Sequence, residues 1–185
     1  MKKQLLTLAL VLLSAFGMTS RAQTYCSVPY TTGCTYGDYI NDVIIGSFSD
    51  LSTGCSTGNY YDGTGDTIEI SLADPVSISL TAGYSNQYFG IWIDLNDDGD
   101  FADTGEFVWS NPTASGTAGT ATTGSFTVPS TFSTGSYRLR IVDHYAGSQM
   151  LASESCTGAS YGEYHDYMVK INPAPACATP LNLAA

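Results

Sequence analysis

Short segments of alternating hydrophobic and polar residues follow one another along most of the chain. In one of them Ile68, Ile70 and Leu72 fall on the same face, because successive side chains of a strand point to opposite sides. Glycine, serine, threonine and asparagine separate these segments, as is typical of turns between strands. Segments of this kind cover residues 39–48, 67–72, 76–80, 89–95, 106–109, 124–128, 136–143 and 164–171. The pattern predicts about eight strands and no helix of useful length.

The spacing of the predicted strands favours an all-β fold. A parallel sheet needs long crossover connections, usually helices, and this sequence shows no alternation of strands with helical segments. We therefore predict an antiparallel β-sandwich of jelly-roll-like form. Residues 113–124 are almost wholly threonine, alanine, serine and glycine, so a long loop or a weak edge strand is expected there.

The chain begins with the features of a signal peptide. Lys2 and Lys3 precede an apolar run over residues 5–18, and Ala22 ends a site of the kind that signal peptidase cleaves. Residues 1–22 are therefore expected to be removed, so that the protein is secreted or displayed at the cell surface. The rest of the sequence has no stretch of about 18 apolar residues, so no membrane span is expected after cleavage.

The mature part is expected to hold one domain and the beginning of another. Residues 23–172 have the length and hydrophobic content of a single β domain. Pro173 and Pro175 break the last predicted strand. Residues 173–185 are therefore expected to form a linker and the start of a truncated following domain.

Removal of the leader leaves a strongly acidic protein. The chain has 6 basic and 17 acidic residues, and three of the basic ones, Lys2, Lys3 and Arg21, lie in the leader. The remaining basic residues are too few to form the patch that phosphate groups require. Nucleic acids and anionic membranes are thereby excluded as partners, and a cation is favoured.

The most informative segment follows the apolar residues 89–93. Six carboxylates lie within residues 94–106, and the order D-x-N-x-D-G places oxygen-bearing side chains at alternate positions of a loop that Gly99 allows to turn. Calcium is surrounded in proteins by about six to eight oxygens, so we predict a Ca²⁺ site here. The predicted ligands in this loop are Asp94, Asn96, Asp98, Asp100, Asp103 and Glu106.

The predicted calcium loop differs from an EF-hand. Glu106 is the thirteenth residue of the loop, whereas the bidentate glutamate of an EF-hand is the twelfth, and strands instead of helices are expected on either side. The alternative is a plain polar hairpin, since Asp-Gly is itself a turn signal. Zinc is disfavoured, because the cysteines are spread out and His144 and His165 lack a paired ligand spacing.

All five cysteines lie in the mature part, where an oxidising compartment favours disulfides. Four cysteines can pair in three ways. We favour Cys26 with Cys34, which enclose a short turn-rich segment, and Cys55 with Cys156, which the fold must bring together. Cys177 is then left for the following domain.

Several short motifs occur in a fixed order along the mature chain. They are Tyr25-Cys26, residues 37–43 (GDYINDV), 52–55 (STGC), 90–96 (GIWIDLN) leading into 99–101 (GDF), 127–129 (TVP), 137–140 (YRLR) and 161–167 (YGEYHDY). Together these motifs resemble the GEVED domain of secreted and surface bacterial proteins, over about residues 25–172. In the naming motif Glu163 and Asp166 match the first Glu and the Asp, whereas Tyr164 and His165 replace Val and the second Glu.

The resemblance implies a noncatalytic β module. Such modules are commonly placed beside fibronectin type III domains, proteases or adhesive repeats in large exported proteins, often with a sorting domain for type IX secretion. The tail 177–183 looks like the opening of a fibronectin type III domain. From the resemblance, Glu163 and Asp166 are expected to complete the cation site begun by the acidic loop. The alternative is that both are solvated acids at the end of a strand.

The sequence carries few signs of catalysis. It has no G-x-S-x-G elbow, no H-E-x-x-H motif and no glycine loop for phosphate. Asp143 and His144 are adjacent on a predicted strand and point to opposite faces, as do Glu163 and Asp166, so neither pair forms an acid–base site by itself. We therefore expect no enzyme.

The expected function is that of a calcium-stabilised extracellular module for adhesion or substrate recognition, with a glycan or protein as partner. The alternative is a carbohydrate-binding module of a secreted hydrolase or protease, because aromatic side chains can act as platforms for sugars. Trp92 is expected in the core instead, between Ile91 and Ile93. The candidate platforms are Tyr60, Tyr61, Tyr84, Tyr88, Trp92 and Trp109.

Overall fold

The structure is a computed structural model and describes residues 24–145 and 147–176. The expected signal peptide and the part of the tail that holds Cys177 lie outside the described residues. The strands are β1 (Ile40–Ile45), β2 (Phe48–Leu51), β3 (Tyr60–Ser71), β4 (Val76–Ala82), β5 (Gln87–Ile93), β6 (Phe107–Ser110), β7 (Thr122–Phe126), β8 (Gly135–Tyr145) and β9 (Gly162–Asn172). The described helical segments are the short 3₁₀ turns η1 (Thr57–Asn59) and η2 (Ala152–Glu154), and neither is long enough to cross a membrane.

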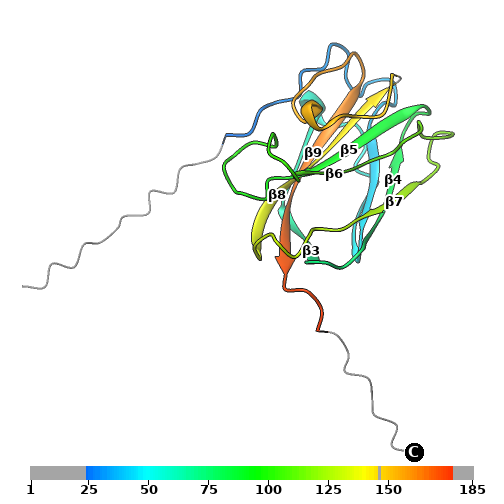
Figure 1. Cartoon of the computed structure of the whole chain (residues 1–185). Coiled ribbons are helices and arrows are strands. Elements are labelled where there is room, and N and C mark those ends of the chain that lie inside the picture. The colour runs from blue at the N-terminus through cyan, green and yellow to red at the C-terminus, as the bar shows by residue number, and fades with distance from the viewer. Residues whose placement is uncertain (1–23, 146, 177–185) are drawn as a thin grey trace, which may run out of the picture.

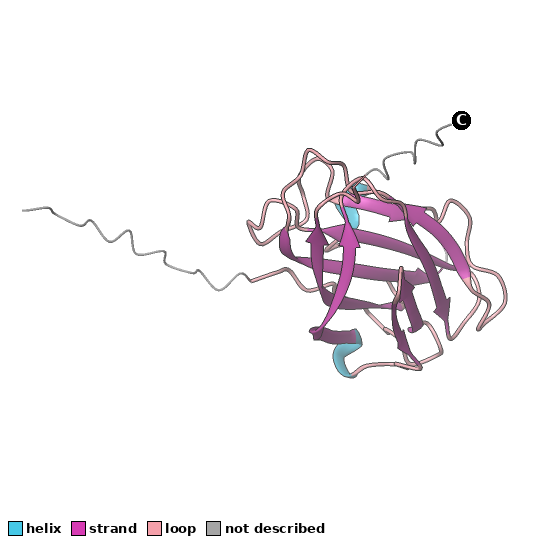
Figure 2. Cartoon of the chain, turned by 90° about the horizontal axis from the view of Figure 1, so that it is seen from below, coloured by secondary structure: helices cyan, strands magenta, loops and turns pink. Residues whose placement is uncertain are grey.

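The strands form two sheets that pack face to face (Figures 1 and 2). One sheet has four strands in the order β2-β1-β4-β7, and the other has five in the order β3-β9-β8-β5-β6. The predicted all-β sandwich is therefore confirmed. The predicted segment 39–48 is divided into β1 and β2 by a turn in which Gly46 adopts a φ of 60° and Ile45 pairs with Phe48, as two-residue hairpin turns require.

One strand pair departs from the antiparallel expectation. Strands β3 and β9 run parallel, whereas the other described pairs are antiparallel. A hairpin can join only antiparallel neighbours, and β3 and β9 are instead connected through all the intervening strands. The connection between the two parallel strands is therefore not a helical crossover. It consists of strands β4 to β8, after which the chain returns to the edge of the sheet as β9 and pairs with β3.

The main hydrophobic core lies between the two sheets. Alternate residues of β3, β8 and β9 point into it, for example Ile68, Leu139 and Val169, each 0% exposed. A second cluster lies on the outer face of the five-stranded sheet and contains Val28, Trp92, Phe101, Val142, Met150 and Tyr164. Strand β5 is therefore buried on both faces, and the prediction that Trp92 belongs to the core is confirmed.

The disulfides differ from the favoured pairing. Cys26 pairs with Cys156 across 130 residues, and Cys34 pairs with Cys55 across 21, with Cα–Cα distances of 5.8 and 5.3 Å. The pairing 26–34 and 55–156 is thus wrong. The reason is that the N-terminal segment crosses the outer face of the sheet, where the Arg140 guanidinium binds the carbonyls of both Cys26 and Ser155.

Candidate functional site

The acidic loop joins β5 to β6 and is fixed at its start by Asp94. This side chain is 0% exposed, and its carboxylate accepts hydrogen bonds from the Tyr25 hydroxyl (2.7 Å) and the backbone N–H groups of Asp98 (3.2 Å) and Gly99 (3.0 Å). Gly99 has a φ of 100°, a conformation that a residue with a side chain rarely adopts. The hydrogen bonds of Asp94 therefore hold the loop in its folded-back conformation without the help of an ion.

Glu106 closes the same loop from its other end. Its Oε1 accepts a hydrogen bond from the Leu95 N–H (3.0 Å), and its Oε2 accepts one from the Asp103 N–H (3.1 Å). The side chain is 1% exposed; burial raises the pKa of Glu106, and the two backbone N–H groups oppose this rise. Glu106 is thus already engaged with the backbone of the loop.

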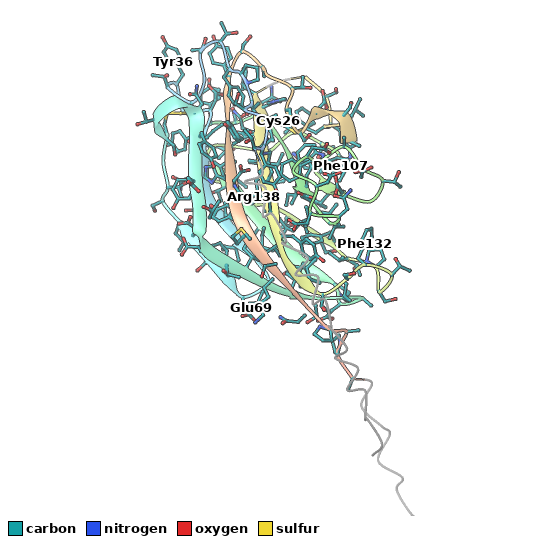
Figure 3. The ribbon with its side chains drawn as sticks, turned by 90° about the vertical axis from the view of Figure 1, so that its left-hand side faces the viewer. Cys26, Tyr36, Glu69, Phe107, Phe132 and Arg138 are labelled. Atoms are coloured by element: carbon teal, nitrogen blue, oxygen red, sulfur yellow. A yellow bond between two sulfur atoms is a disulfide. The ribbon has the colours of Figure 1, made fainter. Side chains whose placement is uncertain are left out.

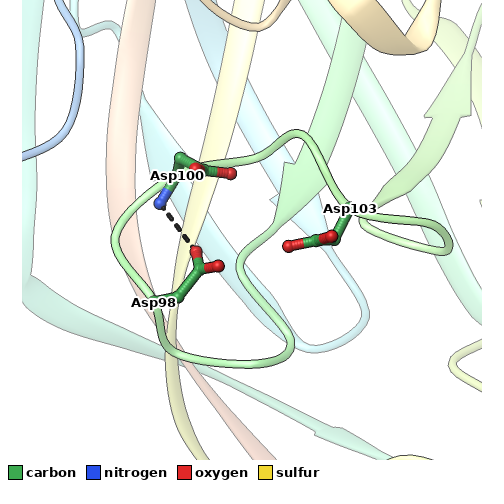
Figure 4. A group of neighbouring side chains, drawn as sticks. All are labelled: Asp98, Asp100 and Asp103. Atoms are coloured by element: carbon green, nitrogen blue, oxygen red, sulfur yellow. Dashed lines mark hydrogen bonds between the residues drawn. The ribbon is translucent and has the colours of Figure 1, made fainter.

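The exposed carboxylates of the loop gather at its centre (Figure 4). One oxygen from each of Asp98, Asp100 and Asp103 lies within 4.8 Å of the others. The Asn96 amide donates to Asp98 (3.0 Å) and Asp103 (2.7 Å), and the Asp98 carboxylate accepts from the Asp100 N–H (3.2 Å). The structure therefore brings three of the predicted ligands into one group, with Asn96 beside them and Asp94 and Glu106 supporting the backbone.

The other two predicted ligands have different partners. The Glu163 carboxylate accepts hydrogen bonds from the backbone N–H groups of Ser56 (2.7 Å) and Ile40 (3.1 Å), and its Oε2 lies 3.2 Å from His165 Nε2. Asp166 forms a double hydrogen bond with the Arg140 guanidinium, at 2.8 Å for each nitrogen. Neither acid therefore adds to the loop, and the alternative that both are solvated is also wrong, since they are 0% and 2% exposed.

Arg140 links the acidic loop to the N-terminal segment. Its guanidinium lies over the rings of Phe101, at 4.9 Å, and Tyr164, at 4.8 Å, and donates to the Cys26 carbonyl at 2.7 Å. Phe101 belongs to the acidic loop and packs against Tyr25 with ring centroids 5.1 Å apart. The loop is therefore attached to the sheet through Phe101, which contacts the Arg140 guanidinium and packs against Tyr25.

A family model described as the GEVED domain matches residues 88–170. The chain contains a GEVED domain. The matched range runs from β5 to β9 and so includes the acidic loop, Arg140 and the altered naming motif. Among curated proteins none matches the chain.

Most of the aromatic side chains considered as sugar platforms pack against other parts of the GEVED domain. Tyr60 stacks on Tyr164 with ring centroids 4.7 Å apart, and Tyr61 and Trp109 pack against the main core. Tyr84 is the exception, with 46% of its surface exposed. Tyr84 shares a cavity with three other tyrosines that the sequence analysis did not identify as candidates. These are Tyr36, Tyr145 and Tyr161. Each lies in or beside a turn, where no periodic pattern marks it.

A buried polar cluster, which the sequence analysis did not predict, lies beside the main core. Gln87 of β5, Asp143 of β8 and Glu163 of β9 are each 0% exposed. Asp143 and Glu163 are directly opposite each other in the register of β8 and β9. Asp38, which precedes β1, accepts a hydrogen bond from the Gln87 amide at 2.7 Å. Alternation places Asp143 on the inward face of β8 and Glu163 on the inward face of β9, but it does not indicate that the two residues lie opposite each other.

Proposed function

We propose that the GEVED domain is a calcium-stabilised, noncatalytic module. It would form part of a larger exported protein and recognise an extracellular partner. The observation that carries the proposal is the group of three facing carboxylates in the loop between β5 and β6, described above. Oxygen ligands of this kind are those that Ca²⁺ selects. The two disulfides among the described residues support an oxidising, extracellular setting.

The charge balance of the loop supports a bound divalent ion. Asp98, Asp100 and Asp103 are exposed, and none of the described ion pairs of this chain involves them. Like charges this close repel one another, and salt in solution screens such a group only in part. A divalent cation at the centre of the group would offset this repulsion and would join the two halves of the loop.

A carbohydrate ligand is the alternative for the recognition role. The exposed ring of Tyr84 favours it, since an aromatic face can pack against the apolar face of a sugar. The rings of Trp92 and Trp109 are engaged elsewhere, so a flat row of platforms is absent from the part of the chain that the structure describes.

Calcium-dependent melting tests the proposed function. At a free Ca²⁺ concentration about a hundred times the dissociation constant, binding adds about 2.7 kcal/mol to native stability. For a domain of this size that corresponds to a rise of about 5–10 °C in melting temperature over the protein in excess EDTA. Differential scanning calorimetry of the whole chain provides the measurement.

Two variants make the test specific to the loop. Asp98→Asn combined with Asp103→Asn removes two exposed ligands without disturbing the buried Asp94 and Glu106, and is expected to abolish the calcium effect. Asp74→Asn changes an exposed acid in the turn between β3 and β4 and should keep it. Equal melting temperatures of the unaltered protein in EDTA and in millimolar calcium would contradict the proposal.

A further inference from the structure

A cavity of about 450 Å³ opens at one end of the sandwich. It lies where the loop before β1, the turn between β4 and β5, the end of β8 and the start of β9 come together. Tyr36 marks this end in Figure 3, and Glu69 lies toward the opposite end. We call the cavity the tyrosine cup; its lining residues are Tyr36, Asp38, Tyr84, Tyr145 and Tyr161.

The four rings of the tyrosine cup contact one another edge to face. Ring centroids are 5.7 Å apart for Tyr84 and Tyr145, 5.8 Å for Tyr145 and Tyr161, and 6.4 Å for Tyr36 and Tyr161, with interplanar angles of 64°, 85° and 70°. Successive rings therefore turn their faces in different directions, as the walls of a cage do. Tyr36 and Tyr84 are 71% and 46% exposed, which leaves the cup open to solvent.

The one acidic group of the cup is Asp38, which is 4% exposed. Its carboxylate accepts a hydrogen bond from the Gln87 amide, and no arginine or lysine of the described chain forms an ion pair with it. Burial raises the pKa of Asp38, and the Gln87 hydrogen bond opposes this rise. The negative charge of Asp38 is therefore only partly compensated by the protein.

A second buried carboxyl group, Asp143, lies close enough to Asp38 for the two to interact electrostatically. Burial, followed by the charges of Asp38 and Glu163, raises the pKa of Asp143, and neither oxygen of Asp143 accepts a hydrogen bond from the described residues. The Glu163 carboxylate is engaged by two backbone N–H groups and lies 3.2 Å from the His165 ring. Asp38 is therefore the acidic group that a cation in the tyrosine cup would meet.

The backbone holds the cup in shape without a ligand. The Tyr39 N–H donates to the Gly37 carbonyl (2.9 Å), and the Gly83 N–H donates to the Tyr39 carbonyl (3.0 Å), which joins the loop of Tyr36 to the turn of Tyr84. Gly37 has a φ of 102°, so a side chain there would strain the loop. The Tyr145 N–H donates to the Tyr161 carbonyl at 3.3 Å. Binding therefore needs little ordering of the site.

We propose that the tyrosine cup binds a small alkylammonium group, with the tyrosine rings around the cation and Asp38 as its counter-ion. Aromatic faces attract cations through their quadrupole, and cages of such rings recognise quaternary ammonium groups. A neutral sugar would pack on the rings but would leave the negative charge at the base uncompensated. The inference gives a ligand class to the recognition role proposed above and so rests on that role.

Calorimetric titration of the calcium-loaded chain with choline tests the inference. The matched probe is the neutral isostere of choline, in which a tert-butyl group replaces trimethylammonium, because it has the same shape without the charge. Choline is expected to bind at least about ten times more tightly than the isostere, a ratio that a single compensated charge can provide. Glucose is titrated in parallel as the probe for a sugar site.

Variants assign the binding to the cup. Asp38→Asn preserves an acceptor for the Gln87 amide and is expected to weaken choline binding about tenfold. Tyr84→Ala should weaken it about threefold, whereas Tyr84→Phe, which keeps the aromatic face, should stay within about twofold. Asp74→Asn, an exposed acid outside the cup, serves as the control and should bind choline as the unaltered protein does. Melting curves verify that each variant is folded.

Several outcomes would overturn the inference. Equal binding of choline and its isostere, no binding of choline, or choline binding of unchanged affinity in Asp38→Asn would each exclude an ammonium site with Asp38 as counter-ion. Glucose binding that is lost in Tyr84→Ala would identify a sugar site instead. If choline fails while calcium still raises the melting temperature, only this inference is lost; if calcium also has no effect, the proposed function fails with it.

Discussion

Replacing Asp143 by asparagine should stabilise the domain above acidic pH. Asp143 lies on β8 opposite Glu163, is 0% exposed, and has no hydrogen bond to either side-chain oxygen within the described residues. Burial, together with the charges of Asp38 and Glu163, raises the pKa of Asp143 well above its ordinary value. Asparagine has nearly the same shape, carries no charge, and offers two N–H donors to the acids around it.

The size of the effect follows from proton linkage. A carboxyl whose pKa is raised by folding holds its proton more tightly in the native state, so its contribution to stability is greatest below the unfolded pKa of about 3.9 and is lost as pH rises toward the native value. The loss is at most about 1.4 kcal/mol for each pH unit in that range. Between about pH 5 and about pH 7 the unaltered protein should therefore lose up to about 2.7 kcal/mol relative to Asp143→Asn.

Urea unfolding at these two pH values, in saturating calcium, measures the difference. Other acids with raised pKa values, such as Asp38 and Glu106, are present in both proteins, so their contributions largely cancel in the comparison. Asp74→Asn, at an exposed position, should follow the unaltered protein at both pH values. If Asp143→Asn shows the same pH dependence as the unaltered protein, Asp143 is not a protonated, unpaired group, and the reasoning is refuted.

Two further predictions concern the ion pair of Arg140 and the two disulfides. Arg140→Ala would leave the buried Asp166 with only the longer contact to Arg138 (3.5 Å) and is expected to lower the free energy of unfolding by about 3–5 kcal/mol in urea titrations. Lys170→Ala, which breaks an exposed pair with Glu69, should cost at most about 1 kcal/mol. Peptide mapping without reduction should recover Cys26 joined to Cys156 and Cys34 joined to Cys55; a Cys26–Cys34 peptide would contradict the fold of the N-terminal segment.

The strands could be predicted from the sequence because their signal is local. The alternation of Ile68, Ile70 and Leu72 places all three in the core, as the structure has them. The parallel pairing of β3 with β9 and the two disulfides could not be predicted in the same way. Both join segments that are distant along the chain, and local periodicity contains no information about which distant segments meet.

The same distinction explains which site residues could be predicted. The acidic loop is a local feature, because its spacing alone lets Asn96 contact both Asp98 and Asp103. The positions of Glu163 and Asp166 were predicted wrongly because the partners of both come from segments that are distant along the chain. The backbone of β1 and of the segment before η1 meets Glu163, whereas Arg140 of β8 meets Asp166.

The two groups of acids in the domain differ in how their charge can be satisfied. The carboxylates of the loop are exposed, so an ion from solution can reach them directly. Asp143 is fully buried, and its raised pKa favours the neutral form, whereas Asp38 lines the tyrosine cup, where a cation can meet it. Apolar residues in place of Asp38, Asp143 and Glu163 would avoid the cost of burying several acids together. A partly compensated acidic cluster beneath an aromatic cavity is therefore better explained by a cation that binds in the cup than by the stability of the sandwich alone.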